Sequence, residues 1–375
     1  MMLLPEVDAL VRLAVTAGFV FFIVLVLVYV ERKVLGHIQQ RLGPMRTGFH
    51  GILQTPADAI KLLVKEDLTP ESADRWVFRI APFLTFVPIF MMFVTIPFTA
   101  DIAVRHLDLG VFYLIAFSTL HIVGMLMAGW GSDNKFALLG GIRAAAQLVS
   151  YELPLAFAIL GVALIADSLN LFEIVALQTA VPFLLLQPLG LLIFFIASLA
   201  ELSRTPFDIP MAESEVVGGP MVEYSGMRWA VFFLAEYASM FVTAALVSVL
   251  YLGGWLWPYL PSAEVLDGWA ARLAGLAWFM AKTFAILYLV IWLRGTLPRL
   301  RIDQLMGFAW KMLIPFSFLN ILITAAAVVY GEAFLVVGWL ATVWFGWSIY
   351  RVTRPRPLRL ETRDSRLETA YARNP

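Results

Sequence analysis

Long runs of apolar residues constrain this chain more than any other feature of its sequence. Windows of about 20 mostly apolar residues, the length that crosses the hydrocarbon core of a bilayer, fall near 10–30, 76–98, 110–130, 143–166, 181–200, 227–252, 271–293, 307–330 and 332–350. The segments that join them are too short for a folded soluble domain. The pattern predicts an all-α polytopic membrane protein with about nine transmembrane helices in a single transmembrane domain over residues 1–350.

The remaining composition excludes several classes of protein. Lys and Arg together number 27, as do Asp and Glu, so no basic field attracts the chain to nucleic acid. Cys is absent and the 4 His residues have no metal-ligand spacing. Because disulfides and thiolate-bound iron–sulfur clusters need Cys, we expect neither, and we expect no metal site. Any redox centre should therefore lie in another subunit.

The positions of the basic residues predict an orientation. If successive loops alternate between the two sides, the outer loops between spans contain only Arg105. By the positive-inside rule, the side rich in Lys and Arg faces the cytoplasm, so the N-terminus lies outside and the C-terminus inside. The basic residues on the cytoplasmic side are Arg32, Lys33, Arg41, Arg46, Lys61, Lys65, Arg75, Lys135, Arg204, Arg294, Arg299, Arg301 and those of the tail.

Two segments outside the spans have patterns of their own. At about 51–66 apolar residues recur at helical spacing, with Asp58, Lys61 and Lys65 on the opposite face. This pattern predicts an amphipathic helix in the cytoplasmic membrane surface, a solvated connector being the alternative. The tail at 351–375 is rich in Arg, which is typical of a cytoplasmic segment bound to anionic lipid or to a partner.

Three predicted spans carry a charged residue near their middle, namely Glu152, Glu236 and Lys282. An ionised group at the centre of a membrane helix costs about 2.5–3.5 kcal/mol on insertion scales, so each needs a partner, a proton or water. One interpretation is a set of buried ion pairs that fix helix packing, for example Lys282 with one of the glutamates. The other is a path for protons.

The connector at about 201–226 favours the path for protons. It contains several acidic residues and one basic residue, Arg204, interleaved with apolar pairs and with Gly218-Gly219-Pro220. We expect backbone that folds back against the membrane domain, a solvated acidic loop being the alternative. Carboxylates crowded at low dielectric titrate as a coupled set, which can store and pass protons. The candidate relay residues are Glu152, Glu201, Asp208, Glu213, Glu215, Glu223 and Glu236.

A series of motifs in the connecting segments and spans carries a family resemblance. They are Glu31-Arg32-Lys33-Val34-Leu35-Gly36, Arg41-Leu42-Gly43-Pro44, Ala57-Asp58-Ala59-Ile60-Lys61, Asn134-Lys135-Phe136-Ala137-Leu138-Leu139-Gly140, Ser150-Tyr151-Glu152, Arg204-Thr205-Pro206-Phe207-Asp208, Ala212-Glu213-Ser214-Glu215, Ala235-Glu236-Tyr237, Trp292-Leu293-Arg294-Gly295-Thr296-Leu297-Pro298-Arg299 and Asp303-Gln304-Leu305. From about 20 to 330 the chain resembles the H subunits of bacterial NADH–quinone oxidoreductase, or respiratory complex I, a family whose mitochondrial counterpart is subunit 1.

This resemblance implies a membrane subunit that forms part of the quinone-binding chamber and links quinone reduction to proton translocation. Quinone is the implied substrate. Members of this family hold no flavin, haem or iron–sulfur cluster of their own, so we expect none in this chain. The acidic residues above match the trail of carboxylates leading away from the chamber. The implied quinone-binding residues are Arg32, Asp58, Lys61, Arg204, Arg294 and Arg299.

The resemblance also implies partners and a location. The partners are the quinone-site and terminal iron–sulfur subunits of the peripheral arm on the cytoplasmic face, small and antiporter-like membrane subunits, and lipid. The location is the bacterial inner membrane. Met211 departs from the pattern, since many relatives have Glu there, and Thr119 and His121 lie where some relatives have an acidic residue. Neither Thr119 nor His121 is assigned a role.

Two other functions are weighed against this one. The related subunit of a membrane-bound hydrogenase or formate hydrogenlyase shares the fold and several of the acids. A stand-alone secondary transporter would place its substrate site at the kinked helices near the bilayer midplane. The transporter would work without partners, whereas a non-redox subunit of the oxidoreductase is expected to have no activity as an isolated chain.

Overall fold

A computed structural model describes residues 5–256, 268–331 and 334–353. Within them, each of the predicted apolar windows contains a helix. The longer helices are α1 (Pro5–Ile38), α3 (Arg75–Met92), α4 (Gly110–Gly131), α5 (Lys135–Ala166), α8 (Pro188–Glu201), α10 (Gly226–Tyr251), α12 (Trp269–Thr296), α14 (Ile314–Tyr330) and α15 (Leu335–Thr353). The short ones are α2 (Gln54–Val64), α6 (Leu171–Ala176), α7 (Phe183–Leu186), α9 (Glu213–Val216) and α13 (Ile302–Phe308). Most of the Arg-rich tail lies outside the described residues.

The all-α polytopic fold is confirmed. Among the described residues, 7 helices are long and apolar enough to cross a membrane, and α8 is a shorter apolar helix. The window at 181–200 is broken because Pro188 begins α8 and the preceding Gln187 has non-helical backbone angles. The window at 143–166 belongs to a longer helix. α5 begins at Lys135, where the side chain of Asn134 accepts a hydrogen bond from the Phe136 amide.

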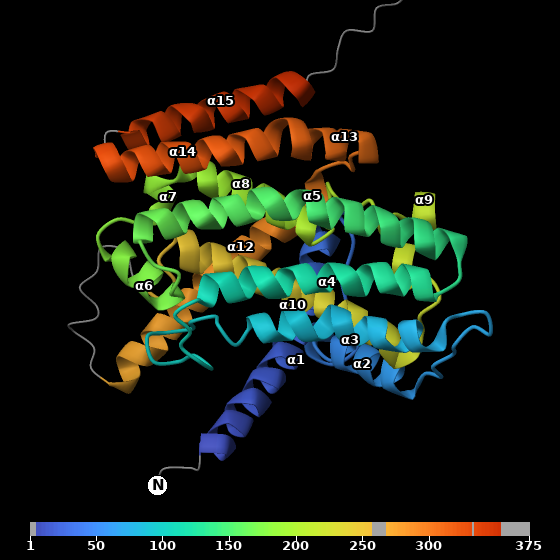
Figure 1. Ribbon diagram of the computed structural model, residues 1–375. Helices are drawn as coiled ribbons and strands as arrows, with labels where there is room; N and C mark the ends of the chain where they lie inside the picture. The colour runs from blue at the N-terminus through green and yellow to red at the C-terminus, as the bar shows by residue number, and fades with distance from the viewer. Residues whose placement is uncertain (1–4, 257–267, 332–333, 354–375) are drawn as a thin grey trace, which may run out of the picture.

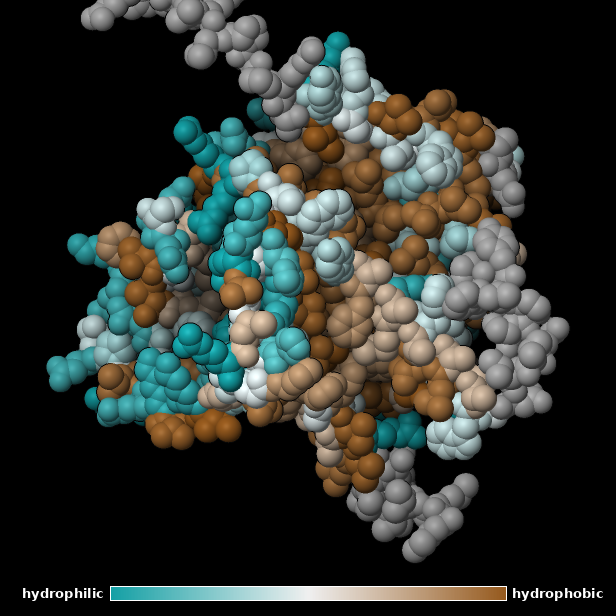
Figure 2. All heavy atoms as spheres, turned by 180° about the vertical axis from the view of Figure 1, so that it is seen from behind, coloured by the Kyte–Doolittle hydropathy of each residue, from teal (hydrophilic) through white to brown (hydrophobic). Residues whose placement is uncertain are grey.

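The long helices pack side by side with α5 near the middle (Figure 1). α5 contacts α4 on one side and α8 and α14 on the other, and α3 joins α4 to α10. α10 also contacts α1, α2 and α12. Figure 2 shows hydrophilic side chains gathered toward the end where α2 and α9 lie, and hydrophobic side chains over much of the remaining face.

The segment between α8 and α10 packs against the helices. Ala212, Val216 and Pro220 in this segment are buried. Its 3-10 turn at Gly219–Met221 contacts both α4 and α5. The contact is close because both partners are glycine: a Cβ at Gly140 of α5 would lie 2.5 Å from Gly219 Cα. The acidic connector is therefore held against the ends of the helices.

This close contact generates a prediction. Gly140→Ala should lower the thermal unfolding midpoint of the assembled protein, because the backbone of the connector must shift, as overpacking costs about 1–3 kcal/mol. Gly346→Ala in α15 is the matched control, since a Cβ there meets nothing within 4 Å. Equal midpoints for both variants would show that the connector is not packed as described.

Candidate functional site

A large cavity lies between α1, α2 and α10. Its volume is about 610 Å³. Apolar side chains from α1 and α10 line most of it, among them Phe21, Val28, Phe233 and Leu234. The charged part of the lining comes from Arg32 at the end of α1 and from three residues of α2 and its C-cap: Asp58, Lys61 and Lys65. The cavity thus has apolar walls and a charged end.

The charged end is fixed by a bond between two helices. The Arg32 guanidinium donates to Asp58 Oδ2 at 2.6 Å, which joins α1 to α2. Gln54 Nε2 donates to the other Asp58 oxygen at 3.1 Å. Asp58 is therefore held on both oxygens, and the amphipathic helix α2 forms part of the cavity wall. Arg32, Asp58 and Lys61, three of the six residues expected to bind quinone, meet here.

Arg204 and Arg294 meet instead at a buried carboxylate beside the cavity. Glu31, next to Arg32 in α1, has a side chain 4% exposed. Arg204 Nη1 donates to Glu31 Oε1 at 3.2 Å, and Arg294 Nη1 of α12 donates to the same oxygen. Arg204 Nη2 lies 3.0 Å from Glu236 Oε1, and its guanidinium lies over the Tyr237 ring. We call Glu31, Arg204, Glu236 and Arg294 the ion cluster.

The electrostatics of the ion cluster keep Arg204 charged. Arg204 lies in the connector after α8, and its side chain is 3% exposed. Burial works against the charged guanidinium, but the attraction of Glu236, of Tyr237 and of Asp208 outweighs it and raises the pKa of Arg204 above its ordinary value. A permanent positive charge therefore sits between a carboxylate of α1 and a carboxylate of α10.

The sixth expected quinone residue, Arg299, pairs with a relay candidate. Arg299 Nη2 lies 3.0 Å from Asp208 Oδ2, and the Leu300 amide donates to the Pro206 carbonyl at 3.0 Å. Burial raises the pKa of Asp208, Arg299 and Arg204 act against this rise, and Glu213 adds to it. As pH falls through this raised pKa, Asp208 takes up a proton and its ion pair with Arg299 is lost.

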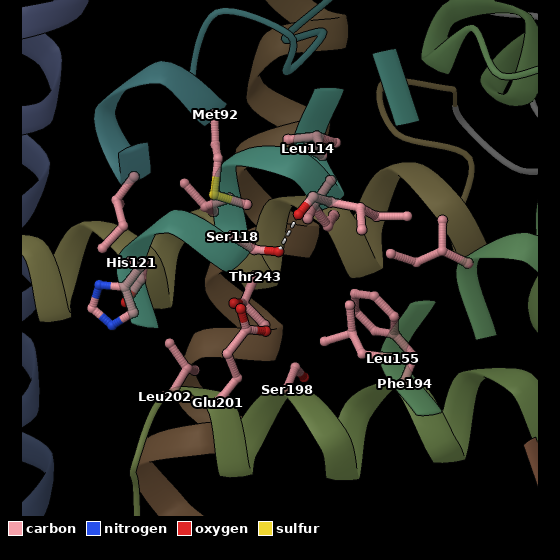
Figure 3. Close-up of a pocket in the computed structure, with 16 residues that line it drawn as sticks. Met92, Leu114, Ser118, His121, Leu155, Phe194, Ser198, Glu201, Leu202 and Thr243 are labelled. Atoms are coloured by element: carbon pink, nitrogen blue, oxygen red, sulfur yellow. Dashed lines mark hydrogen bonds between the residues drawn. The ribbon is translucent and has the colours of Figure 1, made fainter. Parts of the chain in front are cut away.

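Three of the relay candidates lie inside the helix bundle. Glu201 projects from the end of α8 into a cavity of about 40 Å³, together with Ser118, Ser198 and Thr243 (Figure 3). Glu201 also lines a second cavity, of about 30 Å³, into which Glu236 faces. Glu152 accepts a hydrogen bond from Ser118 Oγ at 3.4 Å. Each volume exceeds the roughly 10–15 Å³ that one water molecule needs.

The other relay candidates lie in the connector that follows α8. Glu213 and Glu215 of α9 are exposed. Glu215 pairs with Arg143 of α5 at 2.6 Å, with 50% of its side chain exposed. Glu223 accepts a hydrogen bond from Asn134 Nδ2 at 2.6 Å. The acidic residues therefore divide into an inner group, Glu152, Glu201 and Glu236, and an outer group that includes Glu213, Glu215 and Glu223.

Lys282 has no part in either group. Its ammonium donates to the carbonyls of Leu252, Gly254 and Leu256 at 2.5, 2.9 and 2.7 Å. These carbonyls follow the end of α10, where a cation is favourable. The suggested ion pair with a glutamate is absent from the described contacts of Lys282. Among the described residues, no group of three or more His, Cys, Asp or Glu side chains is arranged to hold a metal ion.

Two residues of the site were missed in the sequence. The sequence points to Glu31 only as part of a motif, although a carboxylate directly after an apolar run of some 20 residues is itself a signal of a buried partner. Arg143 is the first residue of the predicted apolar window at 143–166, whereas α5 begins at Lys135. Its partner Glu215 lies 72 positions later, so spacing along the chain gave no indication of the pair.

Comparison with known proteins places this chain in a family. A family model described as NADH dehydrogenase matches residues 11–325. The chain is 51% identical over 314 residues to the H subunit of NADH-quinone oxidoreductase from Geobacillus kaustophilus, covering 84% of this chain and 90% of that protein. It is 47% identical to the same protein of Brevibacillus brevis, with 86% and 93% covered, and 46% identical to that of Dehalococcoides mccartyi, with 85% and 86% covered.

The ion cluster generates a prediction of its own. Glu31→Gln should leave Arg204 and Arg294 without their shared anion, and removing one partner of a buried pair typically costs about 3–5 kcal/mol. We expect a lower thermal midpoint and less assembled protein in membranes. Asp101→Asn, which removes the partner of Arg272 from a pair with side chains 59% and 43% exposed, should leave both unchanged. Equal effects of the two substitutions would contradict a buried cluster.

Proposed function

Since the chain belongs to the family of H subunits of NADH–quinone oxidoreductase and is a membrane subunit of that complex, we propose that the cavity between α1, α2 and α10 is part of its quinone-binding chamber. The observation that carries this proposal is the meeting of Arg32, Asp58 and Lys61 at one end of a cavity of about 610 Å³. The carbonyl oxygens of a quinone accept hydrogen bonds, and its isoprenoid tail is apolar. A cavity with apolar walls and cationic donors at one end fits both parts.

The ion cluster gives this cavity an electrostatic connection to the inner carboxylates. Arg32 lines the cavity, and its neighbour Glu31 belongs to the ion cluster. Arg204 contacts both Glu31 and Glu236, and Glu236 faces the same small cavity as Glu201. Glu201 and Glu152 repel each other when both are ionised. A charge that appears at the charged end of the large cavity therefore changes the protonation of Glu236, Glu201 and Glu152.

We propose that this connection couples quinone reduction to proton translocation in the complex. Reduction of a quinone to a quinol consumes two electrons and two protons. The electrons come from a redox centre in a partner subunit, so this chain contributes binding and charge. Before the protons arrive, the reduced quinone is an anion, which attracts Arg32 and Lys61 and competes with Asp58 and Glu31 for positive charge. The inner carboxylates Glu236, Glu201 and Glu152 respond by taking up or releasing protons.

The same proposal sets orientation and partners. The end bearing α2 and α9, where hydrophilic side chains gather (Figure 2), faces the cytoplasm and the peripheral arm with its quinone-site and terminal iron–sulfur subunits. The chain lies in the bacterial inner membrane with its N-terminus outside, beside the small and antiporter-like membrane subunits. The relatives reported above are subunits of NADH–quinone oxidoreductase, so neither the hydrogenase nor the transporter function is proposed.

A tryptophan in the cavity wall tests the quinone site. Ala230 of α10 lines the cavity, so Ala230→Trp should fill part of it and raise the KM for quinone several-fold. Ala274→Trp, at an exposed position of α12, is the control. NADH oxidation by a soluble acceptor should be the same in both variants, because it bypasses quinone. An unchanged KM in Ala230→Trp, at wild-type assembly, contradicts the assignment of the cavity.

The division of the acidic residues gives a second test. Glu236→Gln removes the carboxylate that Arg204 contacts, so inhibitor-sensitive quinone reduction or its proton yield should fall several-fold. Glu215→Gln removes an exposed carboxylate whose pair with Arg143 is worth about 0–1 kcal/mol, so both quantities should stay close to wild type. The assay is NADH-driven proton uptake in inverted membrane vesicles. Wild-type values in Glu236→Gln would contradict the coupling route.

A further inference from the structure

His121 lies where the two small cavities meet, and the coupling route above does not use it. It projects from α4 at the edge of the cavity that Glu201 enters (Figure 3). It also lines the second cavity, together with Thr85, Met211 and Glu236. His121, Glu201, Leu202 and Ser239 are the residues that line both cavities. His121 and Glu201 are thus the titratable side chains common to the two spaces.

One contact fixes the role of each ring nitrogen. His121 Nδ1 lies 3.3 Å from the backbone carbonyl of Thr85 in α3. A carbonyl oxygen only accepts, so Nδ1 carries the hydrogen in this contact. In the neutral ring Nε2 is then an acceptor with a free lone pair. The α3 contact therefore holds the ring in the tautomer that can take up a proton on Nε2.

The charged groups around His121 come from three helices. Glu236 of α10 faces it across the second cavity, and Glu201 of α8 lines both cavities with it. Glu152 of α5 is reached through Ser118, which lines the first cavity. Arg204 pairs with Glu236 at 3.0 Å. From the connector, the apolar Met211 lines the second cavity. The titratable groups that line the two cavities with His121 are therefore acidic, and opposite charges of this kind favour the protonated form of an imidazole.

We propose that His121 is a proton-relay residue between Glu236 and Glu201, an inference that rests on the coupling route proposed above. Protonated Glu236 gives its proton, through water in the second cavity, to Nε2 of His121. The ring becomes an imidazolium and Glu236 a carboxylate. Nε2 then passes the proton to the Glu201 carboxylate, and the ring returns to the neutral tautomer with hydrogen on Nδ1. Each step moves one proton, and no electron pair leaves or enters.

A bracing role is the competing explanation. α3 and α4 pack very closely at this level, since a Cβ at Gly124 would lie 2.5 Å from Thr85 Oγ1. The bond from His121 to the Thr85 carbonyl could simply join these helices. A side-chain amide preserves such a bond but does not carry protons near neutral pH. His121→Gln and His121→Asn therefore separate bracing from proton transfer.

The experiment uses the intact complex reconstituted in liposomes. NADH-driven quinone reduction and protons moved per electron are measured for His121→Gln and His121→Asn, with assembly normalised to NADH oxidation by a soluble acceptor. We expect coupled turnover to fall about tenfold, less than the 10²-fold or more typical of losing a positioned proton-transfer group, because Glu201 and Ser239 still connect the cavities. His121→Glu, which can carry a proton, should recover part of the loss.

His106→Gln is the matched control. His106 is exposed, lies 4.0 Å from the Phe172 ring between centroids, and lines neither small cavity. It should behave as wild type. Wild-type turnover and proton yield in either amide variant overturn the proposal, as does a loss that His121→Glu does not reduce at all. Glu201→Gln in the same assay distinguishes failure of the coupling route from failure of the His121 proposal. If Glu201→Gln and the His121 variants all behave as wild type, the coupling route fails. If Glu201→Gln is impaired and the His121 variants are not, only the role of His121 fails.

Discussion

The buried guanidinium of Arg204 determines how the rest of this site is arranged. A cation removed from water must be surrounded by anions, and Glu31 of α1 and Glu236 of α10 supply them. Glu31 also binds Arg294 of α12, so one cluster joins three helices to the connector. Buried ion pairs often add little net stability, because desolvation offsets their attraction. Their effect here is geometric: the cluster fixes where the end of α1, and with it Arg32, lies relative to the inner carboxylates.

α10 then separates the two functional spaces. Ala230, Phe233 and Leu234 face the large cavity, while Phe232, Glu236 and Ser239 face the second small cavity. Opposite faces of the same helix turns thus serve quinone binding and the protonation of carboxylates. A small movement or a change of charge on one face of α10 therefore acts on the other face across the width of a single helix. The proposed coupling needs no long conformational pathway at this point, since Arg204 already contacts a residue on the acidic face.

The sequence predicts the helices well and the ion cluster poorly, for a physical reason. Apolar periodicity is local, so the spans and α2 follow from it. The grouping of Arg32 with Asp58 and Lys61 is implied by the family resemblance instead. Ion pairing depends on tertiary structure: Glu31 binds residues 173 and 263 positions away. The same limit applies to Lys282, whose partners are backbone carbonyls that no side-chain pattern reveals. The break at Gln187 follows from Pro188, at which α8 begins. Spacing along the chain also does not predict which acidic residues belong to the inner group and which to the outer group.

Infrared difference spectroscopy of the intact complex on quinone reduction tests the central claim most directly, because carboxyl groups absorb differently when they gain or lose a proton. If charge in the large cavity reaches the inner carboxylates through the ion cluster, quinone reduction produces a carboxyl signal in the wild type. Glu201→Gln or Glu236→Gln diminishes this signal, whereas Glu215→Gln, at an exposed position, leaves it intact. A carboxyl signal identical in all four proteins, or dependent on Glu215 alone, would contradict the account.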